Sequence, residues 1–323
     1  MKAVRMIPGA QGASLVVQDI PQPQLPPGQV MVRVRAAGLN RGEIAYAEIH
    51  RSGDAVTNGV EFAGEVAAVG AGVTQWREGD RVMGHGRFCH AQYTVADPLA
   101  LMRIPDAMTF VEAAAFPNVF ITAHDAVVTN GQLRAGESIL VNGASGGVAT
   151  AALQVASLLG ASAIFATSRS AAKLERLREF GANVLVDVTR DSQLDAVMAA
   201  TDKRGVDVVI DTIGGIVFDQ NVKSLAVKGR LVHIARLGSN TAQIDLTDFW
   251  LKRLKLVGVT FRTRTEQERL ECVQACARDL LPFLEAGRIK LPVDRTFAMD
   301  DVTGAYAYMK QDQHVGKLVL TVD

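Results

Sequence analysis

The sequence contains few cysteines and aromatic residues, and neither sign of charge is in excess. Its 323 residues include 3 Cys and 2 Trp, and 34 Lys and Arg balance 34 Asp and Glu. Three cysteines do not form a disulfide framework, so we expect a reducing, cytoplasmic setting. The balanced charge gives no general attraction to nucleic acid or to an anionic membrane, and we expect neither as a partner.

Long apolar runs are also missing. No uninterrupted stretch is long enough to span a bilayer, and residues 1–9 lack the apolar segment of a secretory signal. At the same time, 48% of the residues are hydrophobic, and 323 residues suffice for two domains of ordinary size. The composition therefore predicts a globular chain with two cores.

The most informative segment runs from Ile139 to Gly160. A short apolar run leads into a glycine-rich turn with Gly143, Gly146 and Gly147, and apolar residues at helical spacing follow. This order predicts a strand, a tight turn and a helix whose first N–H groups face a phosphate. Glycine has no Cβ, so the backbone can approach a pyrophosphate closely. The segment predicts a dinucleotide site.

The residues after the next predicted strand indicate which dinucleotide binds. An enzyme that uses NAD usually places an acidic residue about 20 residues beyond the glycines, against the ribose hydroxyls. No acid stands there; the strand Ala163–Thr167 is followed by Ser168, Arg169 and, shortly after, Lys173. Serine can donate a hydrogen bond, and the two cations suit a 2′-phosphate. We therefore predict NADPH as the cofactor.

The pattern of predicted secondary structure changes near residue 110. The first ~120 residues predict a compact, mostly antiparallel β domain, because short strands alternate with glycine and proline. Its predicted strands are Gln29–Ala37, Val60–Val73, Arg81–Met83 and Ala91–Val95. The tail from Leu291 is again strand-like and is expected to rejoin this domain.

Between these parts, strands and amphipathic segments alternate, which predicts a parallel sheet wrapped by helices with ligands at the carboxyl ends of its strands. The predicted strands are Ser138–Val141, Ala163–Thr167, Asn183–Val186, Val206–Asp211, Arg230–Ile234 and Lys255–Val259. The predicted helices are 147–159, 171–180, 191–200, 215–225 and Thr265–Glu285.

Several motifs, in this order, resemble the medium-chain dehydrogenase/reductase superfamily and its zinc-free quinone oxidoreductase branch. They are Ala36–Asn40, Gly59–Val66, Gly79–Val82, Ala113–Pro117 with Thr122-Ala123, Gly143–Thr150 and Gly316–Val319. The resemblance implies an α/β protein in which a doubly wound Rossmann sheet is joined to a GroES-like, mostly antiparallel β domain. It places the GroES-like catalytic domain at 1–122, completed by 288–323, and the NADPH-binding Rossmann domain at 123–287.

The resemblance also bears on metal binding. Metal-dependent members hold a Cys and a His zinc ligand where this chain has Asn40 and Val60; an amide is a poor zinc ligand, and valine has no donor atom. The run of four cysteines that holds structural zinc in those members is absent too. Cys89 with His85 or His90 falls short of a site, since zinc needs three protein ligands and both histidines are expected at the surface. We expect no metal.

Without a metal, hydride would pass from NADPH to a quinone or to the β-carbon of an α,β-unsaturated carbonyl compound. A hydrogen-bond donor must then face the substrate oxygen on which negative charge develops. The resemblance places Asn40 beside the nicotinamide. The Tyr46 phenol is a second candidate, as a donor or as an aromatic plug. Asp211 is expected to cap its local turn. The cofactor contacts implied by the resemblance are Asn40, Thr122, Ser145, Gly146, Gly147, Val148, Thr212, Gly214 and Phe261.

Two alternatives stay open. An enoyl-thioester reductase would need basic residues along a long cleft, for which Arg41, Arg51 and Arg87 are candidates. A protein that binds NADPH without turnover, in a structural or sensing role, is the other alternative. In either case we expect a homodimer, because the predicted strand Lys255–Val259 would leave an unpaired sheet edge.

Overall fold

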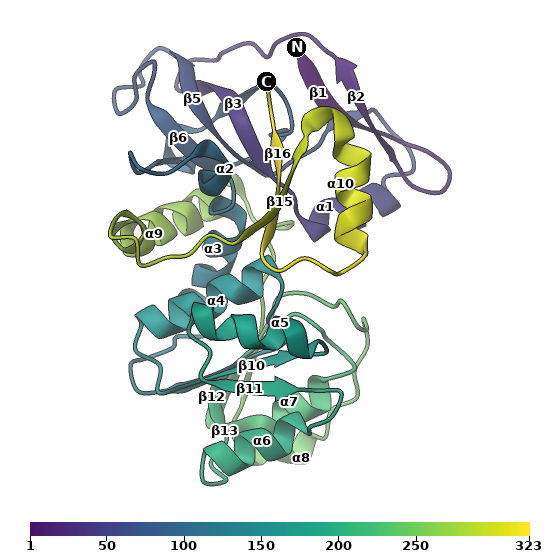
Figure 1. The fold of residues 1–323 in the computed structure, drawn as a ribbon, viewed down its shortest axis with the longest axis vertical. Helices are drawn as coiled ribbons and strands as arrows, with labels where there is room; N and C mark the ends of the chain where they lie inside the picture. Colours follow the sequence, from purple (N-terminus) through teal and green to yellow (C-terminus); the bar gives the residue numbers. More distant parts are fainter. The chain divides into compact units, whose positions relative to one another are not determined.

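The computed structural model describes residues 1–323 and divides into two compact units. The first unit combines Met1–Asn118 with Gln267–Asp323, and the second is Val119–Glu266 (Figure 1). These limits differ from the expected 123–287, because helix α9 (Glu266–Glu285) groups with the first unit. Its Gln274 side chain donates to the Leu99 carbonyl of that unit at 2.6 Å. No helix combines the length and hydrophobicity that a membrane span requires.

The first unit contains a three-stranded sheet, in the order β2-β1-β4, and a seven-stranded sheet, in the order β15-β16-β3-β5-β6-β8 with β7 paired to β3. Every pairing except that of β15 with β16 is antiparallel, as predicted. The strands are β1 (Lys2–Ile7), β2 (Ser14–Asp19), β3 (Val30–Gly38), β4 (Val56–Thr57), β5 (Glu61–Val69), β6 (Arg81–His85), β7 (Tyr93–Ala96), β8 (Leu101–Arg103), β15 (Val293–Ala298) and β16 (Lys317–Thr321).

Alternate residues of β3 form the centre of this unit's core. Val30, Val32 and Val34 are at most 1% exposed and pack with Leu318 and Leu320 of β16. Burying each such side chain contributes roughly 1.5–3 kcal/mol. The unit also contains the helices α1 (Arg41–Ile49), α2 (Phe110–Ala113), α9 and α10 (Val302–Lys310). The sequence patterns predicted neither α1 nor α10.

The second unit is a six-stranded parallel sheet in the order β11-β10-β9-β12-β13-β14, which confirms the predicted parallel architecture. The strand order reverses at β9, where the crevice of a doubly wound sheet lies. The strands are β9 (Ser138–Val141), β10 (Ala163–Ser168), β11 (Val184–Asp187), β12 (Val206–Asp211), β13 (Leu225–His233) and β14 (Lys255–Gly258). The helices are α4 (Gly147–Leu158), α5 (Ala171–Arg176), α6 (Gln193–Ala200), α7 (Phe218–Ser224) and α8 (Leu246–Leu251).

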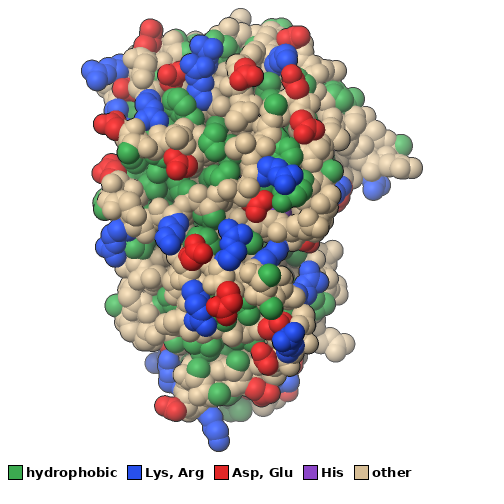
Figure 2. Space-filling model, viewed as in Figure 1, with side chains coloured by type: hydrophobic (Ala, Val, Ile, Leu, Met, Phe, Trp, Pro, Cys, Tyr) green, Lys and Arg blue, Asp and Glu red, His purple; other side chains and the backbone are tan.

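Helix α3 (Pro117–His124) crosses the limit between the two units and continues as a π-helix over Asp125–Asn130. On the face that Figure 2 shows, basic and acidic side chains are interspersed, in keeping with the equal numbers of the two in the sequence. That face has no large surface of one sign that would suit a polyanion.

Candidate active site

The glycine turn of the second unit is held between three strands. The backbone N–H of Ala144 donates to the Thr167 carbonyl at 2.9 Å, which joins the turn after β9 to β10. Gly143 has φ +59°, and a Cβ there would lie 2.8 Å from Ile213 Cδ1 and 2.9 Å from Thr212 Oγ1, beyond β12. Glycine is required at this position because φ is positive and because a Cβ would lie too close to Ile213 and Thr212.

Helix α4 begins immediately after this turn and offers an open N-terminus. Gly146 is its N-cap, no side chain caps it, and its first turn contains no acidic residue. Gly146 is exposed, and Ser145, Gly147 and Val148 are half-buried. The first N–H groups of a helix have no carbonyl partner within it and carry the positive end of the helix dipole. The predicted cradle residues therefore lie together and fit a pyrophosphate.

The residues predicted to contact a 2′-phosphate lie at the end of β10, directly after it and in α5. Ser168 is buried, and its Oγ accepts from the Ser170 backbone N–H at 3.1 Å. Arg169 is exposed and Lys173 is half-buried. The residue in register on β11 is Asp187, whose pKa is lowered by hydrogen bonds from Thr189. Arg169 therefore directly follows the residue that pairs with the ionised Asp187 carboxylate.

Asp211 organises the end of β12. Its Oδ1 accepts from the backbone N–H groups of Ile213 at 2.8 Å and Gly214 at 3.0 Å, which confirms the expected capping role. Its Oδ2 lies 2.9 Å from Nδ1 of His233 on β13, a partner that the sequence did not reveal. Thr212 Oγ1 donates to the Asn142 carbonyl at 2.9 Å. Thr212 is therefore fixed beside the carboxyl end of β9, and Gly214 is fixed at the end of β12.

The predicted contact Phe261 lies in the loop after β14 and is held by an arginine. The Arg264 guanidinium lies 4.7 Å above the Phe261 ring, and its Nη2 contacts the buried carboxylate of Asp125 at 2.6 Å. Asp125 follows Thr122 by one helical turn. This ion pair ties the Phe261 loop to the segment that carries Thr122, and sequence analysis missed it because the partners are 139 residues apart.

In the first unit, Asn40 is the N-cap of α1, and its backbone N–H donates to Glu43 Oε2 at 2.8 Å. The spacing Asn-x-x-Glu is a sequence signal for a helix start and would have revealed α1. Tyr46 lies on this helix and is 41% exposed. Its ring stacks on His50 with a centroid separation of 5.6 Å, and its hydroxyl bonds no other residue. Tyr46 thus offers a hydroxyl to an external group.

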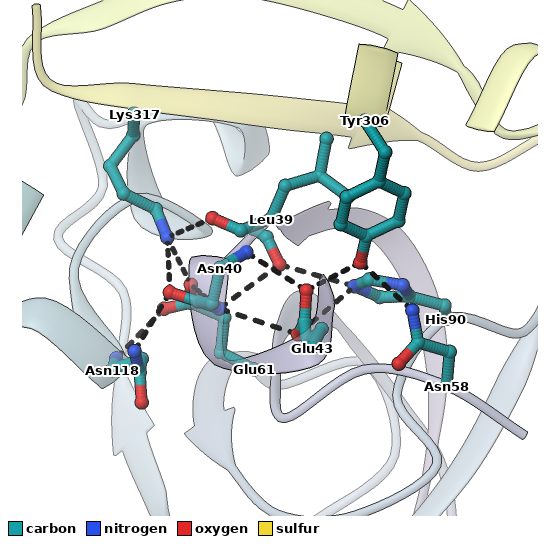
Figure 3. Close-up of polar contacts among 10 residues, drawn as sticks. Leu39, Asn40, Glu43, Asn58, Glu61, His90, Asn118, Tyr306 and Lys317 are labelled. Atoms are coloured by element: carbon teal, nitrogen blue, oxygen red, sulfur yellow. Dashed lines mark hydrogen bonds and ion pairs between the residues drawn. The ribbon is translucent and has the colours of Figure 1, made fainter. Parts of the chain in front are cut away.

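The Asn40 side chain is the centre of a polar network (Figure 3). Its Oδ1 accepts from Lys317 Nζ at 2.8 Å and from Asn118 Nδ2 at 2.7 Å, and its Nδ2 donates to Glu61 Oε1 at 2.9 Å. Lys317 and Glu61 form an ion pair of 2.6 Å with side chains 4% and 0% exposed. Sequence analysis identified neither Lys317 nor Glu61 as a site residue, although both stand in the motifs of the resemblance.

A second branch of the network runs from Glu43 to α10. The Tyr306 hydroxyl donates to Glu43 Oε2 at 2.5 Å and accepts from Asn58 Nδ2 at 2.8 Å. Burial and the charge of Glu43 raise the pKa of Tyr306 well above its usual value, so the phenol stays protonated. His90 Nε2 lies 3.1 Å from the Gly38 carbonyl and 3.8 Å from Glu43 Oε1.

The residues near Cys89 do not fit a metal ion. The expectation of surface histidines was wrong: His85 and His90 are 8% and 0% exposed, because both pack inside the β domain. Burial lowers the pKa of His85 and raises that of the Cys89 thiol well above its usual value, which keeps the thiol protonated. No three His, Cys, Asp or Glu side chains gather as a metal site would require.

Comparisons with known proteins show the family to which the chain belongs. A model of the alcohol dehydrogenase GroES-like domain matches residues 26–129, and a model of the zinc-binding dehydrogenases matches 147–277. Quinone oxidoreductase-like protein 2 of Bos taurus is 29% identical over 314 residues, which are 95% of this chain and 89% of that protein. The chain belongs to the medium-chain dehydrogenase/reductase superfamily, in its quinone oxidoreductase-like branch.

Some other proteins to which the chain is similar come from polyketide synthesis. The polyketide synthase protein NorB of Streptomyces orinoci is 33% identical over 324 residues, and the match spans 98% of this chain but 14% of that protein. Among solved structures, CurK enoyl reductase is 27% identical with a TM-score of 0.85 over 100% of this chain and 99% of that one. An NAD-dependent alcohol dehydrogenase is 28% identical with a TM-score of 0.88 over both chains in full.

Membership of the superfamily confirms the predicted Rossmann and GroES-like architecture and makes the chain an oxidoreductase with a fold for nicotinamide dinucleotides. The zinc positions of that superfamily hold Asn40, which is bonded on both sides of its amide, and Val60. An engaged amide and an aliphatic side chain do not fit zinc.

Proposed function

We propose that the chain is a zinc-independent reductase that transfers hydride from NADPH to a quinone or to an α,β-unsaturated carbonyl compound. The observation that carries this proposal is the replacement of zinc ligands by the Asn40 network. A simple ketone needs strong polarisation of its oxygen before it accepts hydride, whereas a conjugated acceptor delocalises the developing charge. A site without a Lewis acid is therefore suited to conjugated acceptors.

Bound NADPH supplies the hydride. Around it, the start of α4 at Ser145–Val148 binds the pyrophosphate, while Ser168, Arg169 and Lys173 bind the 2′-phosphate. Thr122, Thr212, Gly214 and Phe261 line the remaining cofactor path in the second unit. The Tyr46 hydroxyl donates to the substrate oxygen, because it is the exposed donor nearest in sequence to Asn40. The Asn40 amide, which already makes five hydrogen bonds, acts by shape and position.

An acceptor panel tests the proposal by following NADPH absorbance at 340 nm. We expect quinones and enones to be reduced and simple ketones to be left unchanged. Metal chelators are expected to leave the rate of NADPH oxidation unchanged. Tyr46→Phe is expected to lower kcat for enones by roughly 10- to 100-fold, since one oxyanion donor is lost. Absence of NADPH oxidation with every acceptor would support a non-catalytic cofactor-binding protein instead.

The enoyl-thioester alternative is favoured by the relatives from polyketide synthesis. Of its three candidate arginines, Arg41 is already bound to the Asp312 carboxylate and the Met309 carbonyl. Arg51 and Arg87 are exposed and have no ion-pair partner. If the panel shows turnover only with enoyl thioesters, and Arg51→Ala or Arg87→Ala raises their KM, this alternative holds.

We further propose that two copies associate through β14. This edge strand pairs only with β13, and its Leu256 is 41% exposed. Trp250 of the neighbouring α8 is 73% exposed. Exposed apolar side chains beside an unpaired edge favour two-fold pairing. Sedimentation at micromolar concentration is expected to give a dimer, and Leu256→Lys to give a monomer. A monomeric parent chain would contradict the proposal.

A further inference from the structure

Lys317 is a buried ammonium whose hydrogen bonds are all made to oxygen. It is the first residue of β16, and its side chain is 4% exposed. Nζ donates to the Leu39 carbonyl at 2.8 Å, to Asn40 Oδ1 at 2.8 Å and to Glu61 Oε1 at 2.6 Å (Figure 3). An ammonium has three N–H donors, so this set of acceptors uses its full capacity.

The acceptors lie in the two motifs that hold the zinc ligands of metal-dependent members of the superfamily. Leu39 and Asn40 belong to the first motif, and Glu61 follows Val60 in the second. A positive charge therefore stands among these motifs, but it is covalently part of the chain. We infer that the Lys317 ammonium is the built-in cation of this site, takes the place of a metal ion and fixes the orientation of the Asn40 amide.

The charge balance of the Asn40 network depends on this cation. Glu61 is 0% exposed, and without Lys317 its carboxylate would keep only Asn40 Nδ2 and the Asn118 backbone N–H as donors. The other buried carboxylate, Glu43, is bound by Tyr306 and by the Asn40 backbone N–H. Removing one partner of a buried ion pair leaves an uncompensated charge, which is strongly destabilising.

The same ammonium fixes which end of the Asn40 amide faces which neighbour. An ammonium only donates, so Oδ1 must face Lys317, and Nδ2 is then directed to Glu61. Without Lys317, Oδ1 would keep only the Asn118 Nδ2 donor, so the amide would be held less firmly in this orientation. Lys317 is thus a positioning residue, and its role in turnover is exerted through Asn40.

Chemical rescue of Lys317→Ala tests the inference. The variant leaves a cavity lined by three acceptors, which propylammonium can fill. We expect its unfolding midpoint to fall by about 10 °C and to recover by several degrees, saturably, with propylammonium. Tetramethylammonium, which has no N–H donor, and sodium chloride at equal ionic strength should give no such recovery. Lys2→Ala is the matched control, because Lys2 pairs with Asp300 at the surface with 48% exposure.

Three outcomes would overturn the inference. They are a Lys317→Ala midpoint equal to that of the parent, equal recovery with every cation, and stoichiometric zinc in the purified parent whose removal lowers its midpoint. If Lys317→Ala does not fold, Lys317→Met combined with Glu61→Gln replaces it. This pair removes both charges and should be more stable than Lys317→Met alone; a pair that is less stable would contradict the inference.

A kinetic measurement adds a readout that a purely structural lysine would not move. It rests on the proposed function, whereas the stability and zinc measurements do not. For Lys317→Ala we expect kcat for NADPH oxidation to fall roughly 100-fold with the KM for NADPH within about twofold, and propylammonium to restore kcat. An inactive parent chain would contradict the proposed function. The inference about the Lys317 ammonium would then be tested by the stability and zinc measurements alone.

Discussion

Gly146→Asp is expected to stabilise the folded chain and to weaken NADPH binding by about 100-fold. Gly146 has φ −78° and ψ 156°, which any L-residue can adopt, and a Cβ there would lie 3.8 Å from the Gly143 carbonyl oxygen. Aspartate is a good N-cap, and its charge favours the helix dipole, for a gain of about 0.5 kcal/mol. The same carboxylate would stand where we propose that the pyrophosphate binds, and like charges about 4 Å apart repel by up to roughly 4 kcal/mol near a protein surface.

Gly146→Asn is the matched control, because asparagine caps the helix and fills the same space without charge. We expect it to keep NADPH affinity within about tenfold of the parent. Calorimetric titration and thermal unfolding of both variants measure the two effects. Equal affinities for the Asp and Asn variants would place the pyrophosphate elsewhere.

The second large effect concerns discrimination between cofactors. Arg169→Ala combined with Lys173→Ala is expected to raise the Kd for NADPH by roughly 30- to 100-fold, since charge-assisted hydrogen bonds contribute about 1.5–3 kcal/mol. The Kd for NADH should stay within about twofold, because NADH has no 2′-phosphate. The parent's preference should also weaken with added salt, since Arg169 is exposed.

Arg178→Ala controls for the general loss of positive charge in this region. Arg178 follows Lys173 by five residues, is 54% exposed and pairs with Glu175 at 3.1 Å. Its removal should leave both dissociation constants unchanged. Equal losses for NADPH and NADH in the Arg169 and Lys173 double variant would show that these cations bind the common part of the cofactor.

The second unit could be predicted closely from the sequence. The predicted limits of β9 and β12 agree with the structure, because each is a short apolar run of a strand buried on both faces. Helix α1 was missed since its buried residues are Glu43 and Ala47, which leaves no apolar stripe to detect. Helix α10 lies inside a tail that was expected to be strand-like as a whole.

Asn40 was predicted as a site residue, but the side chains that form hydrogen bonds with it could not be predicted. Asn40 is 277 residues from Lys317 and 78 from Asn118 in the sequence, and only the β3–β16 pairing brings the first two together. Lysine and glutamate are by default surface residues, so nothing local marks Lys317 or Glu61 as buried. The resemblance indicated the motifs in which they stand, without indicating that they meet.

The pairing of β16 with β3 also sets the order in which the molecule can be completed during synthesis. Glu61 leaves the ribosome 256 residues before Lys317, and the whole of Val119–Glu266 is made in between. Domains fold as units while the chain grows. The second unit can therefore fold before Lys317, the counter-ion of the Glu61 carboxylate, has been synthesised. A nascent chain arrested before residue 317 would hold a formed nucleotide fold and an unfinished polar centre.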